Sequence, residues 1–245
     1  MTTTHVLVLD FDGTVCLGDG AVLTYGRLLD DALAATDDGH PRRVVEAVLA
    51  RFVGSPLDDE PEGVDEALAH AQGSPDGYVV AERVSRALGV DDAARSAAYA
   101  GARAALAEGR LDISAPDGLA GFLDALPEGV RVVLVTNSPE HGVVQPLERL
   151  GLADRVDEIV TDARKPSGLP AVLDRLRAEA GLGDRPDRLL SVGDIWPNDL
   201  EPAAAQGSPT ALVERFAAPD ARPTHRATTL PELYPAIRAW ATGAS

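Results

Sequence analysis

The chain has 245 residues, of which 39 are acidic and 22 are basic, so its formal net charge is −17. A surface of this charge repels nucleic acid phosphates and anionic membranes, and we therefore expect neither as a partner. The one cysteine, Cys16, excludes an internal disulfide, and no CxxC spacing indicates structural zinc. The first residues contain neither a basic leader nor a long apolar run, which favours a cytoplasmic protein.

The first predicted element is a buried strand. Residues 6–9, VLVL, form a continuous apolar run with β-branched members, which is typical of a strand inside a parallel sheet. The sequence DFDGT, residues 10–14, follows directly, so Asp10 lies at the carboxyl end of the strand. Ligands of open α/β sheets bind beyond these ends, and two carboxylates placed there are costly unless a cation or substrate uses them. The stretch therefore indicates a binding site.

Residues 17–115 contain helical patterns and no convincing strand. Five helical segments are predicted, over residues 25–39, 41–54, 65–73, 78–90 and 91–109. An insertion of this length is too large to be a loop. We therefore predict a second, all-helical domain over residues 17–115.

Strands and helices alternate in the rest of the chain. Four further strand-like runs cover residues 130–137, 156–162, 188–194 and 210–216. Helical patterns fill residues 117–129, 139–151 and 166–181, and the last two end in glycine, where a helix stop is expected. This alternation predicts right-handed crossovers and an α/β fold, a Rossmann-like three-layer α/β/α core around a parallel sheet. The core would comprise residues 1–16 and 116–245.

Polar clusters recur at the carboxyl ends of these predicted strands. They are Thr136–Asn137–Ser138 after the second strand, Arg164–Lys165–Pro166 after the third, and residues 193–199, GDIWPND, after the fourth. Taken singly, each has a simpler interpretation: a helix cap, a solvated lysine or a polar loop. A parallel sheet brings all of them to one edge, however. Together with DFDGT they form an inventory suited to phosphate chemistry.

In this order, DFDGT, the TN pair, the KP pair and GDxxxND resemble the four motifs of the haloacid dehalogenase (HAD) superfamily. The helical insertion directly after the first motif is similar to that superfamily's C1-type cap domain. The resemblance implies a phosphatase-like hydrolase that uses Mg²⁺ to hydrolyse a small phosphorylated metabolite through an aspartyl-phosphate.

The resemblance also implies roles for individual residues. Asp10 would be the nucleophile, because a carboxylate can attack phosphorus. Asp12 would be the general acid and then the general base, and Lys165 would stabilise Asp10 and the transferring phosphoryl group. The residues expected to contact the substrate phosphate are Gly13, Thr136, Asn137 and Lys165.

Mg²⁺ prefers oxygen ligands and commonly binds one or two protein carboxylates. The side-chain ligands we expect are Asp10 and Asp194, joined by the backbone carbonyl of Asp12 as the resemblance implies. Asn198 and Asp199 are expected in or near the outer coordination shell.

Three alternatives stay open at this point. A phosphomutase resembling β-phosphoglucomutase would use the same core and a helical cap. A 2-haloacid dehalogenase would need no magnesium, but it has no use for an acid at Asp12. A catalytically silent protein that binds a phosphorylated ligand is disfavoured by the complete set of motif residues. Arg42, Arg43 and Arg51 could reach an anionic substrate, although solvated helix faces are the simpler interpretation. The sequence indicates neither the substrate nor the oligomeric state.

Overall fold

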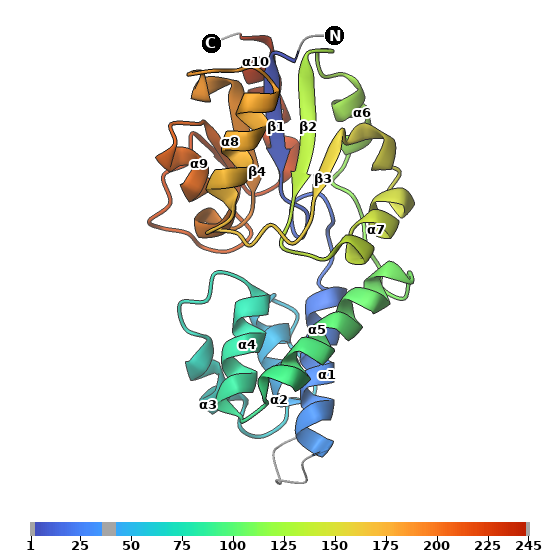
Figure 1. Cartoon of the computed structure of the whole chain (residues 1–245). Helices are drawn as coiled ribbons and strands as arrows, with labels where there is room; N and C mark the ends of the chain where they lie inside the picture. The colour runs from blue at the N-terminus through green and yellow to red at the C-terminus, as the bar shows by residue number, and fades with distance from the viewer. Residues whose placement is uncertain (1–2, 36–42, 244–245) are drawn as a thin grey trace. The chain divides into compact units, whose positions relative to one another are not determined.

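The computed structural model describes residues 3–35 and 43–243. The chain forms two compact units (Figure 1). The core unit consists of Met1–Leu17 and Ile113–Ser245, and the helical unit consists of Gly18–Asp112. Parts of the two expected helices at 25–39 and 41–54, together with Arg42, lie outside the described residues.

The core unit contains a six-stranded sheet in which every neighbouring pair is parallel. Its strands are β1 (His5–Leu9), β2 (Val130–Val135), β3 (Glu158–Val160), β4 (Leu189–Gly193), β5 (Thr210–Val213) and β6 (His225–Ala227). Their order in the sheet is β3-β2-β1-β4-β5-β6, so the direction of winding reverses between β1 and β4. In open α/β sheets, such a switch point is where ligands bind.

Alternate side chains of β1 form two layers of the hydrophobic core. Leu7 and Leu9 pack on one face of the sheet, against residues of α6 (Leu119–Asp124), α7 (Val144–Arg149) and α10 (Leu230–Thr242). Val6 and Val8 pack on the other face, against residues of α8 (Leu169–Glu179) and α9 (Glu201–Ala205). The strand is buried on both sides, which explains its unbroken apolar sequence. The predicted three-layer α/β/α class is confirmed.

The elements of the core unit that were not predicted include α9, β6 and α10, and the last two show why. β6 is three residues long, and its sequence HRA is polar and only partly buried, so it lacks the apolar run that identified the other strands. α10 carries Pro235 in its interior, which ordinarily argues against a helix. α10 is held by packing, since Leu230, Leu233 and Ile237 are buried in the core, and β6 is held by its pairing with β5.

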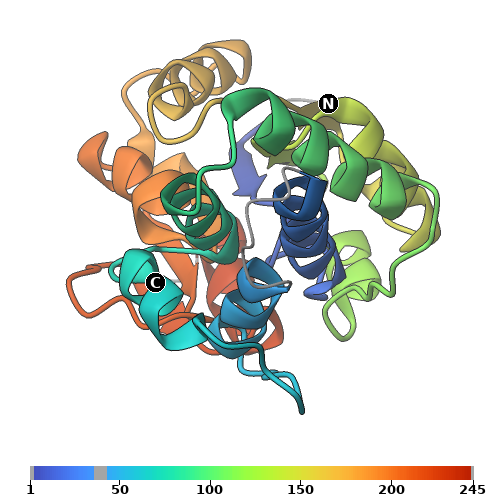
Figure 2. The same cartoon turned by 90° about the horizontal axis from the view of Figure 1, so that it is seen from below.

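The helical unit contains five α-helices among its described residues. They are α1 (Gly20–Ala35), α2 (Val44–Phe52), α3 (Val64–Leu68), α4 (Gly77–Ala87) and α5 (Asp92–Ala107). α1 packs along α2, α4 and α5 (Figure 2), and the unit has a hydrophobic core of its own. Small residues permit this close packing: a Cβ at Gly26 of α1 would lie 2.6 Å from Leu49 of α2.

Arg43 and Arg51 are engaged with carboxylates of the helical unit. Arg43 pairs with Glu46 at 2.8 Å, and Arg51 pairs with both Glu60 and Asp65. These contacts agree with the interpretation of both arginines as ordinary surface residues of helices.

The N-terminus of α2 is capped by a residue from another helix. The residue before α2, Arg43, has a left-handed conformation, and its side chain makes no capping hydrogen bond. Instead, the buried carboxylate of Asp30 on α1 accepts the backbone N–H groups of Val45 at 3.0 Å and Glu46 at 2.9 Å. Asp30 therefore satisfies two of the N–H groups that a helix start leaves without partners.

We expect Asp30→Ala to destabilise the helical unit by about 2–4 kcal/mol, because it leaves two buried N–H groups without an acceptor. The faster hydrogen exchange of the Val45 and Glu46 amides would report this loss locally. Asp31→Ala, which changes the exposed neighbour on the same helix, is the matched control. Equal exchange at these two amides in Asp30→Ala and in the control would contradict the capping role.

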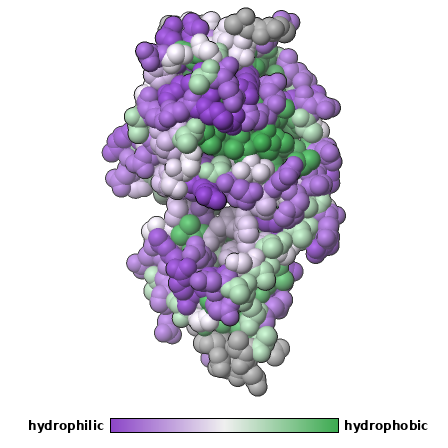
Figure 3. All heavy atoms as spheres, in the orientation of Figure 1, coloured by the Kyte–Doolittle hydropathy of each residue, from purple (hydrophilic) through white to green (hydrophobic). Residues whose placement is uncertain are grey.

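The surface of the core unit seen in Figure 3 is largely hydrophilic, with a hydrophobic strip near β3. β3 lies at one edge of the sheet, and its three residues are all partly exposed. Among the described residues, no helix has the length and apolar character needed to cross a membrane.

Candidate active site

The candidate site lies at the carboxyl ends of the central strands, where the winding of the sheet reverses. Asp10 directly follows β1, and its backbone N–H donates to the carbonyl of Val192 on β4 at 2.9 Å. Asp194 directly follows β4. Leu9 and Val192 are register partners, so the two strands deliver these aspartates to the same level of the sheet. Both carboxylates are buried.

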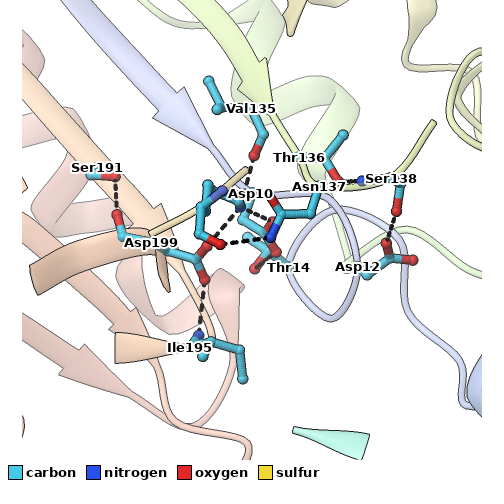
Figure 4. Close-up of polar contacts among 11 residues, drawn as sticks. Asp10, Asp12, Thr14, Val135, Thr136, Asn137, Ser138, Ser191, Ile195 and Asp199 are labelled. Carbon is cyan, nitrogen blue, oxygen red and sulfur yellow. Dashed lines mark hydrogen bonds and ion pairs between the residues drawn. The ribbon is translucent and has the colours of Figure 1, made fainter. Parts of the chain in front are cut away.

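The carboxylate of Asp10 is held on both of its oxygens (Figure 4). Its Oδ1 accepts a hydrogen bond from Lys165 Nζ at 2.6 Å, and its Oδ2 accepts one from the Thr14 hydroxyl at 3.2 Å. Thr14 is fully buried and four residues after Asp10, on the turn that follows β1. The side chain of Asp10 is thus oriented before any substrate arrives, which is a requirement for an efficient nucleophile.

Lys165 donates to three acceptors, one for each hydrogen of its ammonium group. They are Asp10 Oδ1 at 2.6 Å, Asp199 Oδ1 at 2.6 Å and the Val135 carbonyl at 2.9 Å. Burial alone would lower the pKa of Lys165, but Asp10 and Asp199 outweigh it and raise that pKa above its usual value. Lys165 is therefore a fixed positive charge at neutral pH.

The pKa of Asp10 is raised to about 7 by burial and by the nearby charge of Asp199, although Lys165 opposes the rise. The cause is a local excess of negative charge at low dielectric. A further cation beside Asp10 would favour its ionised form, which is the nucleophilic one.

Asn137 orients the segment that carries Lys165. Its side-chain amide donates to the Lys165 carbonyl at 3.0 Å, and its Oδ1 accepts the Lys165 backbone N–H at 2.6 Å. Asp162 and Arg164, earlier in the same loop, have positive φ angles of 49° and 55°. The loop therefore has a specific conformation that Asn137 fixes from the neighbouring strand end.

Asp199 holds Lys165 from the opposite side. It belongs to a short π-helix, Trp196–Leu200, a form often found at functional sites. Its Oδ1 accepts from Lys165, and its Oδ2 accepts the backbone N–H of Ile195 at 3.0 Å. Gly193 makes this approach possible, because a Cβ there would lie 2.4 Å from the Cβ of Asp199. Asn198 precedes Asp199 in the π-helix and is partly buried.

Asp12 is held by a residue that follows β2. Its Oδ2 accepts a hydrogen bond from the hydroxyl of Ser138 at 2.7 Å (Figure 4). The buried hydroxyl oxygen of Thr136 in turn accepts the Ser138 backbone N–H at 3.1 Å. The segment after β2 thereby joins the segment after β1, as the sheet topology predicts.

Gly13 lets the backbone pass close to the acidic cluster. Its φ angle is +84°, and a Cβ at this position would lie 2.3 Å from Asp194 Oδ2 and 2.6 Å from Arg215 Nη1. Only glycine meets both requirements. The short distance from Gly13 to Arg215 Nη1 also shows that Arg215, which follows β5, lies beside the site.

Three buried carboxylates form a set that suits a divalent cation. Asp10, Asp194 and Asp199 each offer an oxygen, and these oxygens lie within 4.8 Å of one another. Asp10 and Asp194 directly follow β1 and β4, and they are the two side-chain ligands that the sequence predicts. All donors are carboxylate oxygens, the type that Mg²⁺ prefers. The chemistry of the donor set therefore fits the expected ion.

The sequence had not assigned roles to three residues of this site: Thr14, Ser138 and Arg215. Thr14 and Ser138 stand inside or directly beside the motifs, so their proximity could have been inferred. Arg215 lies after the fifth strand, in a segment without a recognised motif. A charged residue at the carboxyl end of a strand next to β4 was the only available signal.

A family model, described as haloacid dehalogenase-like hydrolase, matches residues 4–207. The chain therefore belongs to the haloacid dehalogenase-like hydrolase family, and it is a phosphatase-like enzyme of that family. It is 33% identical over 220 residues to a phosphoglycolate phosphatase of Rhodospirillum rubrum, covering 84% of this chain and 78% of that protein.

Solved structures with the same fold cover nearly the whole chain. A predicted phosphoglycolate phosphatase from Haemophilus somnus has a TM-score of 0.62 at 17% identity, over 97% of this chain and 99% of that one. The HAD-hydrolase YfnB from Bacillus subtilis, bound to magnesium, has a TM-score of 0.59 at 18% identity, over 96% and 99%. At these identities the likeness shows the fold alone.

Proposed function

We propose that this protein hydrolyses a small phosphate monoester, with Mg²⁺ as cofactor and an aspartyl-phosphate on Asp10 as intermediate. The observation that carries this proposal is the environment of Asp10. Its buried carboxylate is oriented by Lys165 and Thr14, belongs to an acidic cluster suited to Mg²⁺, and lies two residues before a second carboxylate, Asp12.

The two half-reactions use different carboxylates. In the first, an oxygen of Asp10 forms a bond to phosphorus, the bond from phosphorus to the leaving oxygen breaks, and Asp12 donates a proton to that oxygen. In the second, Asp12 removes a proton from water, whose oxygen bonds to phosphorus and releases phosphate and Asp10. Ser138 orients Asp12 for both transfers through its 2.7 Å hydrogen bond.

The phosphoryl group is negatively charged, and the site that binds it is acidic as well. Lys165 supplies one fixed positive charge, and the hydroxyl of Thr136 supplies a donor for a phosphoryl oxygen. Asp10 and Asp194 would hold Mg²⁺, which supplies charge neutralisation beside the transferring group. Asn137 contributes by keeping Lys165 in place.

The helical unit serves as a cap in this proposal. It is inserted directly after the first motif, the position where a moving lid can exclude water during attack and admit substrate between turnovers. Substrate selectivity then depends on residues 18–112. The Rhodospirillum relative makes 2-phosphoglycolate the first substrate to test.

We expect phosphate release from at least one of 2-phosphoglycolate, sugar phosphates, nucleotides and an aryl phosphate, and we expect chelation to reduce it to background. The reason is that, without Mg²⁺, Lys165 and Arg215 supply less positive charge than the three carboxylates Asp10, Asp194 and Asp199 supply negative charge, and the phosphoryl group adds more. Excess Mg²⁺ added after the chelator should restore the rate. Release that is unchanged by chelator would contradict the role of Mg²⁺.

The same panel separates hydrolysis from its nearest rival. A phosphomutase would convert one sugar phosphate into its isomer, with little free phosphate formed. Chromatography of the sugar phosphates beside the phosphate assay distinguishes these products. Isomer formation that greatly exceeds phosphate release would favour the mutase.

A further inference from the structure

Arg215 brings a second positive charge to the candidate site. It follows β5 by two residues, and its backbone N–H donates to the Val213 carbonyl at 2.9 Å. Its Nη1 lies 3.8 Å from Asp194 Oδ2. The Asp194 side chain is only 4% exposed, whereas that of Arg215 is 27% exposed. The pair therefore joins a buried carboxylate to a partly solvated cation.

Lys165 and Arg215 contact different carboxylates of the acidic cluster. Lys165 contacts Asp10 and Asp199, each at 2.6 Å, and Arg215 faces the third carboxylate, Asp194. Buried carboxylates are costly without opposite charges nearby. Arg215 thus reduces the cost of keeping Asp194 buried when no metal ion is bound.

The contact of Arg215 is much looser than those of Lys165. The distance of 3.8 Å between Nη1 and Oδ2 exceeds the range of a hydrogen bond, so the interaction between these two atoms is electrostatic attraction. The guanidinium also lies over the ring of Phe216, 5.5 Å from its centroid, which is within cation–π range. Arg215 therefore has a second contact and partial access to water, so its guanidinium can stay solvated when it moves away from Asp194.

We propose that Arg215 is an internal counter-ion of the metal site: it neutralises Asp194 in the metal-free protein and is displaced when Mg²⁺ binds. The inference rests on the Asp10–Asp194 metal site of the proposed function. Arg215 and Mg²⁺ compete for one carboxylate and repel each other, so Arg215 weakens metal binding while it stabilises the metal-free site.

The direct test is calorimetric titration of the full-length, substrate-free protein with Mg²⁺. We expect Arg215→Gln to lower the Mg²⁺ dissociation constant about tenfold, the size of one close charge interaction in a solvated site. Arg215→Lys retains the charge and should bind Mg²⁺ much as the wild type does. Arg185→Gln removes an equal charge from an exposed pair with Asp187, before β4 at the opposite end of the sheet, and should change nothing.

Thermal unfolding gives a second readout. With chelator present, Arg215→Gln should unfold at a lower temperature than the wild type, because Asp194 loses its counter-ion. Saturating Mg²⁺ should abolish this difference, since the ion then neutralises Asp194 in both proteins. A residue that only supports the local fold would leave the same difference with and without Mg²⁺, and that result would overturn the proposal.

The titration also separates this inference from the proposed function. Equal Mg²⁺ affinity in folded wild type and Arg215→Gln would overturn the counter-ion role and leave the metal site intact. Absence of Mg²⁺ binding in both folded proteins would refute the metal site itself, and the counter-ion role with it.

Discussion

Asp10→Asn should lower the rate of phosphate release by on the order of 10⁴-fold or more, as expected when a nucleophile is removed. The amide is close in size to the carboxylate and can still accept the hydrogen bond from Lys165, so the fold should persist. What it loses is the negatively charged oxygen that would attack phosphorus. The measurement is turnover at saturating Mg²⁺ with the best substrate of the panel, beside circular dichroism of the variant.

A matched control for this variant is Asp220→Asn. Asp220 is exposed on the loop after β5, so its substitution makes the same change of charge away from the acidic cluster. It should retain wild-type turnover. Wild-type turnover in folded Asp10→Asn would instead refute Asp10 as the nucleophile and require another residue for covalent attack.

Lys165→Met should have two large effects, one on rate and one on stability. Loss of the fixed charge beside the transferring phosphoryl group should lower kcat by about 10²- to 10³-fold. Removing one partner from a buried ion pair typically costs about 3–5 kcal/mol, because the remaining charges stay buried without compensation. Asp10 and Asp199 would be those charges here.

Lys165→Met should also change the pKa of Asp10. Lys165 opposes the rise in that pKa, so its removal should raise the pKa of Asp10 further and favour the protonated form at neutral pH. Denaturant unfolding and initial rates measured on the same preparation report the two effects. Arg175→Met, which removes a partly exposed cation from α8, away from the acidic cluster, is the control. Unchanged rate and stability in Lys165→Met would contradict the geometry described for Lys165.

The sequence predicted the central part of the fold because β1, β2 and β4 consist mainly of apolar residues. A strand that is buried on both faces of a parallel sheet consists mainly of apolar residues, so each of these strands could be identified from its own sequence. β6 is short, polar and at the edge of the sheet, so its sequence lacks an apolar run. Propensity alone therefore gave no indication of it.

The location of the site could be predicted from the sequence, but most of its individual contacts could not. Placing Lys165 beside Asp10 required only that strand ends meet. The contacts that hold Lys165 in place depend on loop conformations: the Asn137 amide pairs with its main chain, and the π-helix delivers Asp199. Arg215 follows a strand without a motif, and its contact with Asp194 depends on the folded arrangement of β4 and β5.

Lys165 is the only lysine in the chain, and the other basic residues are arginines. A compact ammonium with three hydrogens matches its three acceptors, whereas the planar fork of an arginine would not. The candidate site consequently carries its own spectroscopic reporter. Growth on ¹⁵N-lysine would give a single ammonium resonance for the whole protein, and that resonance would report substrate, metal or phosphorylation at Asp10 without any assignment.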